Sequence, residues 1–180
     1  AGREGVLESP GSEGRATEFF DFRDFAGGLL DGLRVCCLVL SVPGQVERHG
    51  RRRMLLKDAD AVVFVADGAP ERIVENRAML RSLVSMIDPA ETPLVLQINK
   101  ADLLTERAER VVEALRLGPD TTWFTARAHD GTGVTDTFLG ALRLATARAR
   151  ALRASGRLPV AALPRSADAL MRYLHEQSEA

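Results

Sequence analysis

Residues 93–103 read Pro-Leu-Val-Leu-Gln-Ile-Asn-Lys-Ala-Asp-Leu, an apolar run of strand length that ends in a polar loop. A second strand is predicted over 61–66, where every side chain is apolar, as is typical of a strand covered on both faces. Segments with helical periodicity alternate with these strands. Such alternation predicts an α/β fold, a three-layer, mostly parallel sheet with helices on both faces.

The remaining elements extend outward from this pair of strands. Thr17–Phe22 and the apolar run 33–40 are predicted to form a hairpin, with turn chemistry at Gly27-Gly28 and Asp31-Gly32. A short strand is predicted over 122–125. Helices are expected over about 48–57, from Pro70 to Asp88-Pro89, over about 104–117 and over about 134–154.

Composition divides the chain into four parts. Residues 1–16 are rich in Gly, Glu, Ser and Arg and are expected to be flexible. The main domain is predicted over 17–154. One glycine and two prolines make 155–165 a linker, and 166–180 is predicted to contain a short helix that folds back on its own domain, with recruitment of a partner as the alternative.

Net charge, the length of apolar runs and the cysteine content exclude several classes of protein. The 180 residues carry a net charge of −1, so no affinity for nucleic acid is expected. The sequence contains no run of 18 apolar residues, so no transmembrane segment is predicted. The N-terminus lacks the apolar part of a secretory signal. Cys36 and Cys37 are adjacent on a strand and point to opposite faces, so they are expected to be thiols in a reducing cytoplasm.

Asn99-Lys100-Ala101-Asp102 is the arrangement N-K-x-D, and its chemistry suits guanine. A carboxylate can accept both adjacent N–H donors of the guanine edge, whereas adenine would leave a buried Asp102 unpaired. Asn99 can tie its loop to the loops on the phosphate side, and the Lys100 stem can lie across the base. Lysine is scarce, since Lys57 and Lys100 are the only two. The alternative interpretation is an ordinary polar turn between a strand and a helix.

Three loops follow predicted strands, namely Ser41–Gln45, Asn99–Asp102 and Arg127–His129. Ligand sites in parallel sheets lie at the carboxyl ends of the strands. The three loops are therefore predicted to converge at one edge of the sheet.

At this point the chain resembles the Ras-like small GTPases, and within them the bacterial gliding-motility (mutual gliding) subgroup, over about residues 12–150. The resemblance rests on T-E-F-F-D-F at 17–22, S-V-P-G-Q at 41–45, V-V-F-V-A-D at 62–67 and N-K-A-D at 99–102. It implies a P-loop NTPase-like fold and a cytoplasmic switch that binds GTP or GDP with Mg²⁺. In the subgroup, such switches act in cell polarity or gliding motility.

The resemblance also implies roles for single residues. Gly44 would donate its backbone N–H to the γ-phosphate, and Gln45 would orient the attacking water. Thr17 would bind Mg²⁺ through its hydroxyl, and Ser41 would reach a magnesium-bound water. The alternative for Thr17 is a threonine that merely begins a strand.

Arg127-Ala128-His129 lies where the family has S-A-K. Ala128 keeps the alanine whose backbone N–H meets guanine O6, while Arg127 and His129 depart from the pattern. The subgroup carries an arginine finger just before the switch threonine. Here that position is Ala16, and Arg15 lies one residue earlier, so either the loop is re-registered or the finger is lost.

The phosphate-binding pattern G-x-x-x-x-G-K-[ST] occurs nowhere in the 180 residues. One explanation is a GTPase that lacks its first strand, phosphate loop and first helix. The other is a degenerate pseudo-GTPase that acts as a protein-binding scaffold without turnover, and an unrelated α/β domain is a third, weaker alternative. The chain as written is expected to bind GTP poorly.

Two groups of arginines remain. Arg48, Arg51, Arg52 and Arg53 are interpreted as a solvated helix face, or as a contact surface for the roadblock-type GTPase activators that the resemblance implies. A second group lies on the last long helix and is expected to face solvent: Arg143, Arg148, Arg150 and Arg153.

Overall fold

The computed structural model describes residues 21–30, 32–42, 49–158, 169 and 172. Contacts divide the chain into two compact units, one formed by residues 1–54 with 159–180 and the other by residues 55–158. None of the helices in the described ranges combines the length and apolar composition that crossing a bilayer requires.

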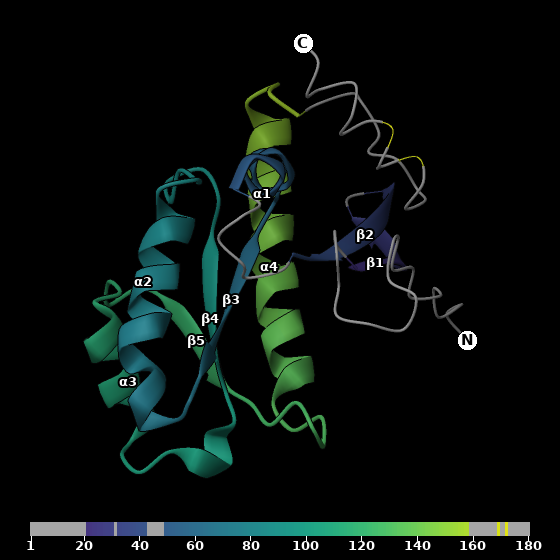
Figure 1. The fold of residues 1–180 in the computed structure, drawn as a ribbon. Helices are drawn as coiled ribbons and strands as arrows, with labels where there is room; N and C mark the ends of the chain where they lie inside the picture. Colours follow the sequence, from purple (N-terminus) through teal and green to yellow (C-terminus); the bar gives the residue numbers. More distant parts are fainter. Residues whose placement is uncertain (1–20, 31, 43–48, 159–168, 170–171, 173–180) are drawn as a thin grey trace. The chain divides into compact units, whose positions relative to one another are not determined.

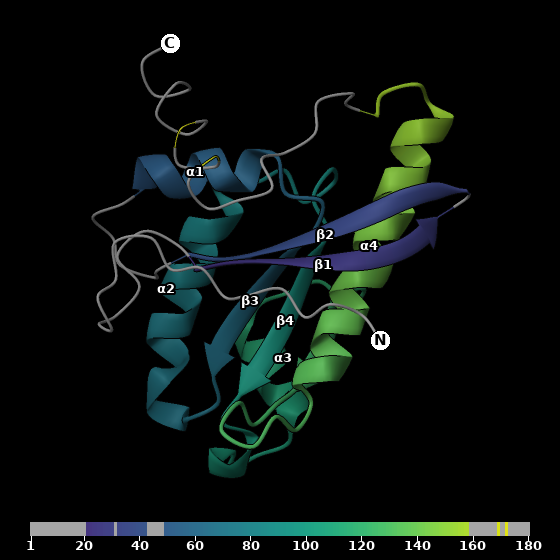
Figure 2. The same ribbon diagram turned by 90° about the vertical axis from the view of Figure 1, so that its right-hand side faces the viewer.

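In the first unit, β1 (Asp21–Leu30) and β2 (Leu33–Ser41) form an antiparallel hairpin (Figure 2). The hairpin is confirmed; positions 17–20 of its predicted first strand lie outside the described residues. Gly27-Gly28 lies inside β1, where the register shifts between Ala26 and Leu29, and not in the turn. The turn is made at Gly32, whose φ of +80° is accessible mainly to glycine.

Cys36 is exposed and Cys37 is half-buried on β2, and no disulfide joins them in the described part of the chain.

Helix α1 (His49–Lys57) matches its predicted range. Arg53 is exposed, but Arg52 is buried. The interpretation of Arg52 as part of a solvated face or contact surface is therefore wrong.

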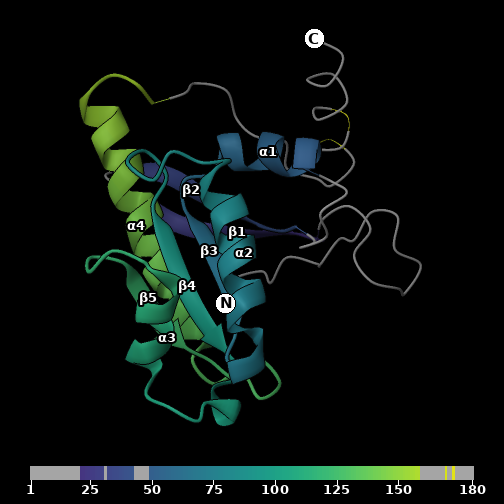
Figure 3. The same cartoon turned by 60° about the vertical axis from the view of Figure 1, so that its left-hand side comes forward.

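The second unit is built on three parallel strands in the order β3 (Val62–Asp67), β4 (Leu94–Asn99) and β5 (Thr122–Thr125). Helices α2 (Ile73–Val84) and α3 (Ala108–Leu115) cover one face, and α4 (Val134–Ala154) covers the other (Figures 1 and 3). The predicted α/β fold class is thereby confirmed.

The core lies between β3, β4 and the helices α2 and α3. Val95, Leu96 and Ile98 of β4 are fully buried. On β3 the burial alternates, because Phe64 and Ala66 pack into the core while Val65 on the opposite face is 53% exposed. The prediction that 61–66 is covered on both faces is therefore wrong; β3 is an edge strand of the described sheet.

Several element boundaries differ from the predicted ones. Pro70 begins a single 3-10 turn, η2 (Pro70–Arg72), before α2, and α2 ends at Val84, ahead of Asp88-Pro89. Helix α3 begins at Ala108, not at 104, because Leu104 is extended after a 3-10 turn. The ranges of β5 and α4 agree with the sequence-based prediction.

Arg148 on α4 joins the helix to the loops that enter the sheet. Its Nε donates to the carbonyl oxygen of Glu91 at 2.6 Å, and its Nη1 lies 2.6 Å from Oδ1 of Asp60. The Arg148 side chain is only 19% exposed, so the expectation that it faces solvent is wrong. Its guanidinium ties α4 to the segments that precede β3 and β4.

Replacing Arg148 by alanine is therefore expected to lower the free energy of unfolding by about 1–2 kcal/mol, because two charge-assisted hydrogen bonds are lost. Arg143→Ala is the matched control, since Arg143 lies on the same helix, is exposed and has a side chain without a partner among the described residues. Urea denaturation of both variants measures the difference. Equal effects of the two substitutions would show that the contacts to Asp60 and Glu91 add nothing.

Candidate functional site

The carboxyl ends of β3, β4 and β5 lie at one edge of the sheet, and a sharp turn follows β4. Asn99 is the last residue of β4, Lys100 is left-handed with φ of +56°, and Ala101–Leu103 forms one 3-10 turn, η3. A left-handed non-glycine residue is unfavourable unless its neighbours hold it. Here the Ala101 N–H donates to the Ala126 carbonyl oxygen at 3.0 Å and stabilises the turn.

The Asn99 side chain connects this turn to the loop after β5. Its Oδ1 accepts the backbone N–H of Ala128 at 3.0 Å. The structure therefore brings Asn99–Asp102 and Arg127–His129 together, as the sequence predicted. The partner differs from the expected one, since Asn99 was expected to reach loops on the phosphate side. The Ala128 N–H, predicted to meet guanine O6, is here donated to Asn99.

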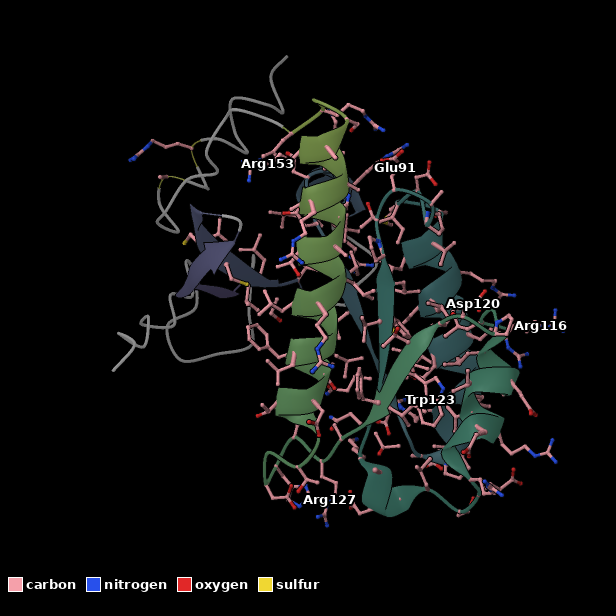
Figure 4. The ribbon with its side chains drawn as sticks, turned by 180° about the vertical axis from the view of Figure 1, so that it is seen from behind. Glu91, Arg116, Asp120, Trp123, Arg127 and Arg153 are labelled. Carbon is pink, nitrogen blue, oxygen red and sulfur yellow. The ribbon has the colours of Figure 1, made fainter. Side chains whose placement is uncertain are left out.

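The loop after β5 is closed on itself. The N–H of Arg127 donates to the Thr132 carbonyl oxygen at 2.8 Å, and the N–H of Thr132 donates to Oδ1 of Asp130 at 2.9 Å. The Arg127 guanidinium lies 3.3 Å from Oδ2 of Asp130. The hydrogen bond from Thr132 lowers the pKa of Asp130. Figure 4 shows Arg127 at the end of β5 that is distant from Asp120.

Asp102 lies within the 3-10 turn, and its side chain is exposed. Its carboxylate makes no ion pair or hydrogen bond within the part of the chain that the structure describes. A carboxylate without an internal partner can accept two hydrogen bonds from a planar ligand edge. This is the chemistry that guanine requires.

Asp67, the last residue of β3, belongs to the same edge, although the sequence analysis gave it no role. Its Oδ2 lies 2.7 Å from Nζ of Lys100, and its Oδ1 accepts the Ala69 N–H at 3.0 Å. The hydrogen bond from Lys100, followed by that from Ala69, lowers the pKa of Asp67. The Asp67 carboxylate is therefore ionised at neutral pH and remains a partner for the lysine.

Two further residues, to which the sequence gave no role, fix this edge: Asn76 holds Asp67, and Gly68 joins the end of β3 to the end of β4. The buried Asn76 side chain pairs with both backbone groups of Asp67, accepting its N–H at 3.1 Å and donating to its carbonyl oxygen at 2.8 Å. The N–H of Gly68 donates to the Asn99 carbonyl oxygen at 2.7 Å. A Cβ at Gly68 would lie 2.7 Å from that oxygen, so only glycine allows this approach. An acidic residue followed by glycine after an apolar strand was the available signal.

Of the other predicted site residues, the structure describes only Ser41. Ser41 ends β2 in the first unit, with its side chain exposed. The remaining four lie outside the described residues: Arg15, Thr17, Gly44 and Gln45. Within the described ranges, no group of three His, Cys, Asp or Glu side chains could hold a metal ion.

Comparison with known proteins adds one relative. No protein-family model matches the sequence. The chain is 35% identical to the mutual gliding-motility protein MglA of Myxococcus xanthus (strain DK1622), in an alignment that covers 78% of this chain and 74% of that protein.

Proposed function

The chain belongs to the gliding-motility family of Ras-like small GTPases, and from that membership we propose that it binds guanine nucleotide and hydrolyses GTP to GDP as a molecular switch. The proposal extends to the process in which the relative is named, gliding motility, and to the cell polarity that directs it. The proposal includes a cytoplasmic location, which the thiols Cys36 and Cys37 support.

One observation carries the proposal. Asn99 links the N-K-A-D turn to Ala128, while the neighbouring Asp102 carboxylate has no partner among the described residues. An acceptor of two hydrogen bonds is thus held beside a backbone segment that can offer a donor. This arrangement supports recognition of a base edge that presents two donors and one acceptor, as guanine does.

Each residue at this edge has a proposed task. Asp102 accepts the two guanine N–H groups, and the aliphatic part of Lys100 lies along the base. The Ala128 N–H meets guanine O6, which requires it to share or exchange its hydrogen bond with Asn99. Arg127, which is partly exposed, is placed to contact the nucleotide from the loop after β5.

The phosphate end of the nucleotide is proposed to involve residues outside the described ranges. Gly44 contacts the γ-phosphate through its N–H, and Gln45 orients the water that attacks it. Arg15 is the candidate for an arginine that stabilises charge in the transition state. These roles rest on the family resemblance of the residues in sequence.

The hydroxyl oxygens of Ser41 and Thr17 suit Mg²⁺ as the metal ion of the proposed switch. Ser41 presents an exposed hydroxyl at the end of β2, and Thr17 offers a second hydroxyl in the sequence. Hydroxyl and water oxygens suit Mg²⁺, which keeps several of its waters when bound to phosphates. When bound, the ion would neutralise charge on the phosphate oxygens.

The proposed partner is a roadblock-type GTPase-activating protein. This part of the proposal rests on the subgroup alone. Of the two arginines of α1 whose burial the structure gives, Arg53 is exposed and Arg52 is not, so Arg53 is the residue to test at such an interface.

The nucleotide carried by the purified gene product, with any residues that precede Ala1, tests the proposal. Denaturation followed by chromatography is expected to release GDP or GTP, and competition is expected to favour guanine over adenine nucleotides by at least about a hundredfold. Equal and weak affinity for ATP and GTP would refute guanine recognition. Tight guanine binding without hydrolysis would instead favour a scaffold.

Replacing Gln45 by leucine is expected to slow GTP hydrolysis by about tenfold or more while leaving GDP affinity unchanged. A leucine of similar size cannot orient water, and phosphoryl transfer depends on that positioning. Single-turnover release of phosphate measures the rate, and displacement of a fluorescent GDP analogue provides the control. An unchanged rate would remove Gln45 from the catalytic step.

A further inference from the structure

Lys100 has unusual constraints for a lysine at a protein surface. Its backbone is left-handed, and its side chain is 54% exposed, yet its ammonium group lies 2.7 Å from the Asp67 carboxylate. The Asp67 side chain is only 21% exposed. A long side chain that would otherwise sample many rotamers is therefore held in one direction.

The carboxylate that holds it is itself fixed. The buried Asn76 side chain hydrogen-bonds to both backbone groups of Asp67. Oδ1 of Asp67 accepts the Ala69 N–H, which leaves Oδ2 of Asp67 for Lys100. The other nearby cation, Arg72, has its Nε 3.9 Å from Asp67 but its Nη1 only 2.6 Å from Glu75. Asp67 is thus chiefly a partner for Lys100.

We propose that Asp67 is a positioning residue for guanine binding, which holds the Lys100 stem beside the base-binding turn before the nucleotide arrives. The inference rests on the proposed function and assigns a specific part of it to β3. A lysine already held in place loses less side-chain freedom on binding than a free one. The loop at 67–69 then affects affinity without touching the base.

The proposal is tested with Asp67→Asn in the full gene product. Asparagine retains an oxygen for the Ala69 N–H but removes the charge that holds the lysine. GDP affinity is expected to weaken about threefold to fivefold, the range for a partly exposed ion pair. Asp120→Asn makes the same chemical change at an exposed site before β5, away from this turn (Figure 4), and should leave affinity unchanged.

A double-mutant cycle separates positioning from a general structural effect. Lys100→Met keeps an unbranched aliphatic stem without the charge, so Asp67→Asn should cause no further loss of affinity in that background. An equal loss in both backgrounds would overturn the inference, because Asp67 would then act without the lysine. Unchanged affinity in Asp67→Asn, with guanine still preferred by the wild type, would overturn it as well. Absence of any guanine preference in the wild type would refute the proposed function instead.

A measurement on the wild type keeps the test decisive if Asp67→Asn does not fold. The side-chain ¹⁵N resonance of Lys100, assigned by its loss in Lys100→Met, is expected to show slow hydrogen exchange, because the ammonium is hydrogen-bonded. The exposed Lys57 has no partner among the described residues and provides the contrast. Protection that persists on GDP addition supports the inference. Loss of protection on GDP addition would show that the lysine leaves Asp67 on binding, and would overturn it.

Discussion

Replacing Asp102 by asparagine is expected to weaken the affinity of the gene product for GDP by about a hundredfold. Each hydrogen bond to a charged group contributes about 1.5–3 kcal/mol, and the carboxylate would accept two from guanine. The loss is therefore about 3 kcal/mol or more, and 1.4 kcal/mol corresponds to a tenfold change. Xanthosine diphosphate is expected to gain affinity, since xanthine replaces the guanine amino group by a carbonyl oxygen that an asparagine N–H can meet.

Displacement of a fluorescent GDP analogue by each nucleotide measures both changes. The matched control is Asp120→Asn, an exposed aspartate before β5 that is expected to alter neither affinity. Because the Asp102 side chain is exposed and lacks an internal partner in the described residues, the substitution should leave folding intact. A variant that keeps its GDP affinity and gains none for xanthosine diphosphate would show that this carboxylate does not contact the base.

Replacing Gly133 by alanine is expected to lower the free energy of unfolding by about 3–4 kcal/mol. Gly133 precedes α4 with φ of +73°, and a Cβ there would lie 2.0 Å from the Thr125 carbonyl oxygen. The left-handed backbone alone costs alanine about 1–2 kcal/mol, and the overlap forces the start of α4 away from β5 at further cost. The loop that carries Ala128 would be displaced together with the helix.

Gly131→Ala is the matched control, because Gly131 has φ of +81° but no atom within 4 Å of an added Cβ. It is expected to cost only the backbone term, about 1–2 kcal/mol. Urea denaturation of both variants isolates the steric contribution at Gly133. Equal destabilisation would mean that α4 can move away from Thr125 without loss.

The order and types of the elements in the second unit were predictable because their periodicity is strong. The runs 94–98 and 122–125 are strands, and the long helix 134–154 has its predicted ends. The predicted element boundaries were wrong where local backbone geometry decides where a helix begins. Leu104 is extended after the left-handed Lys100, which delays α3, and Pro70 opens a 3-10 turn ahead of α2.

The candidate site was predictable only where a motif carries the chemistry. The types and spacing of Asn99, Lys100 and Asp102 indicate guanine without any coordinates, and the position of Ala128 after a strand indicates its loop. Asp67 was missed because its role depends on a lysine distant in the sequence. Arg148 was misassigned for the same reason, since a helical pattern does not show which loop lies across a particular arginine.

Sequence alone determined the α/β class and the chemistry at the end of β4, because hydrophobic period and side-chain type are local properties of the chain. Tertiary structure decided the partners: Asn99 with Ala128, Lys100 with Asp67, and Gly68 against the carbonyl oxygen of Asn99. These contacts join residues that only the parallel pairing of β3, β4 and β5 brings to one edge. Their distances depend on strand register and on the absence of a side chain at Gly68, which no local pattern specifies.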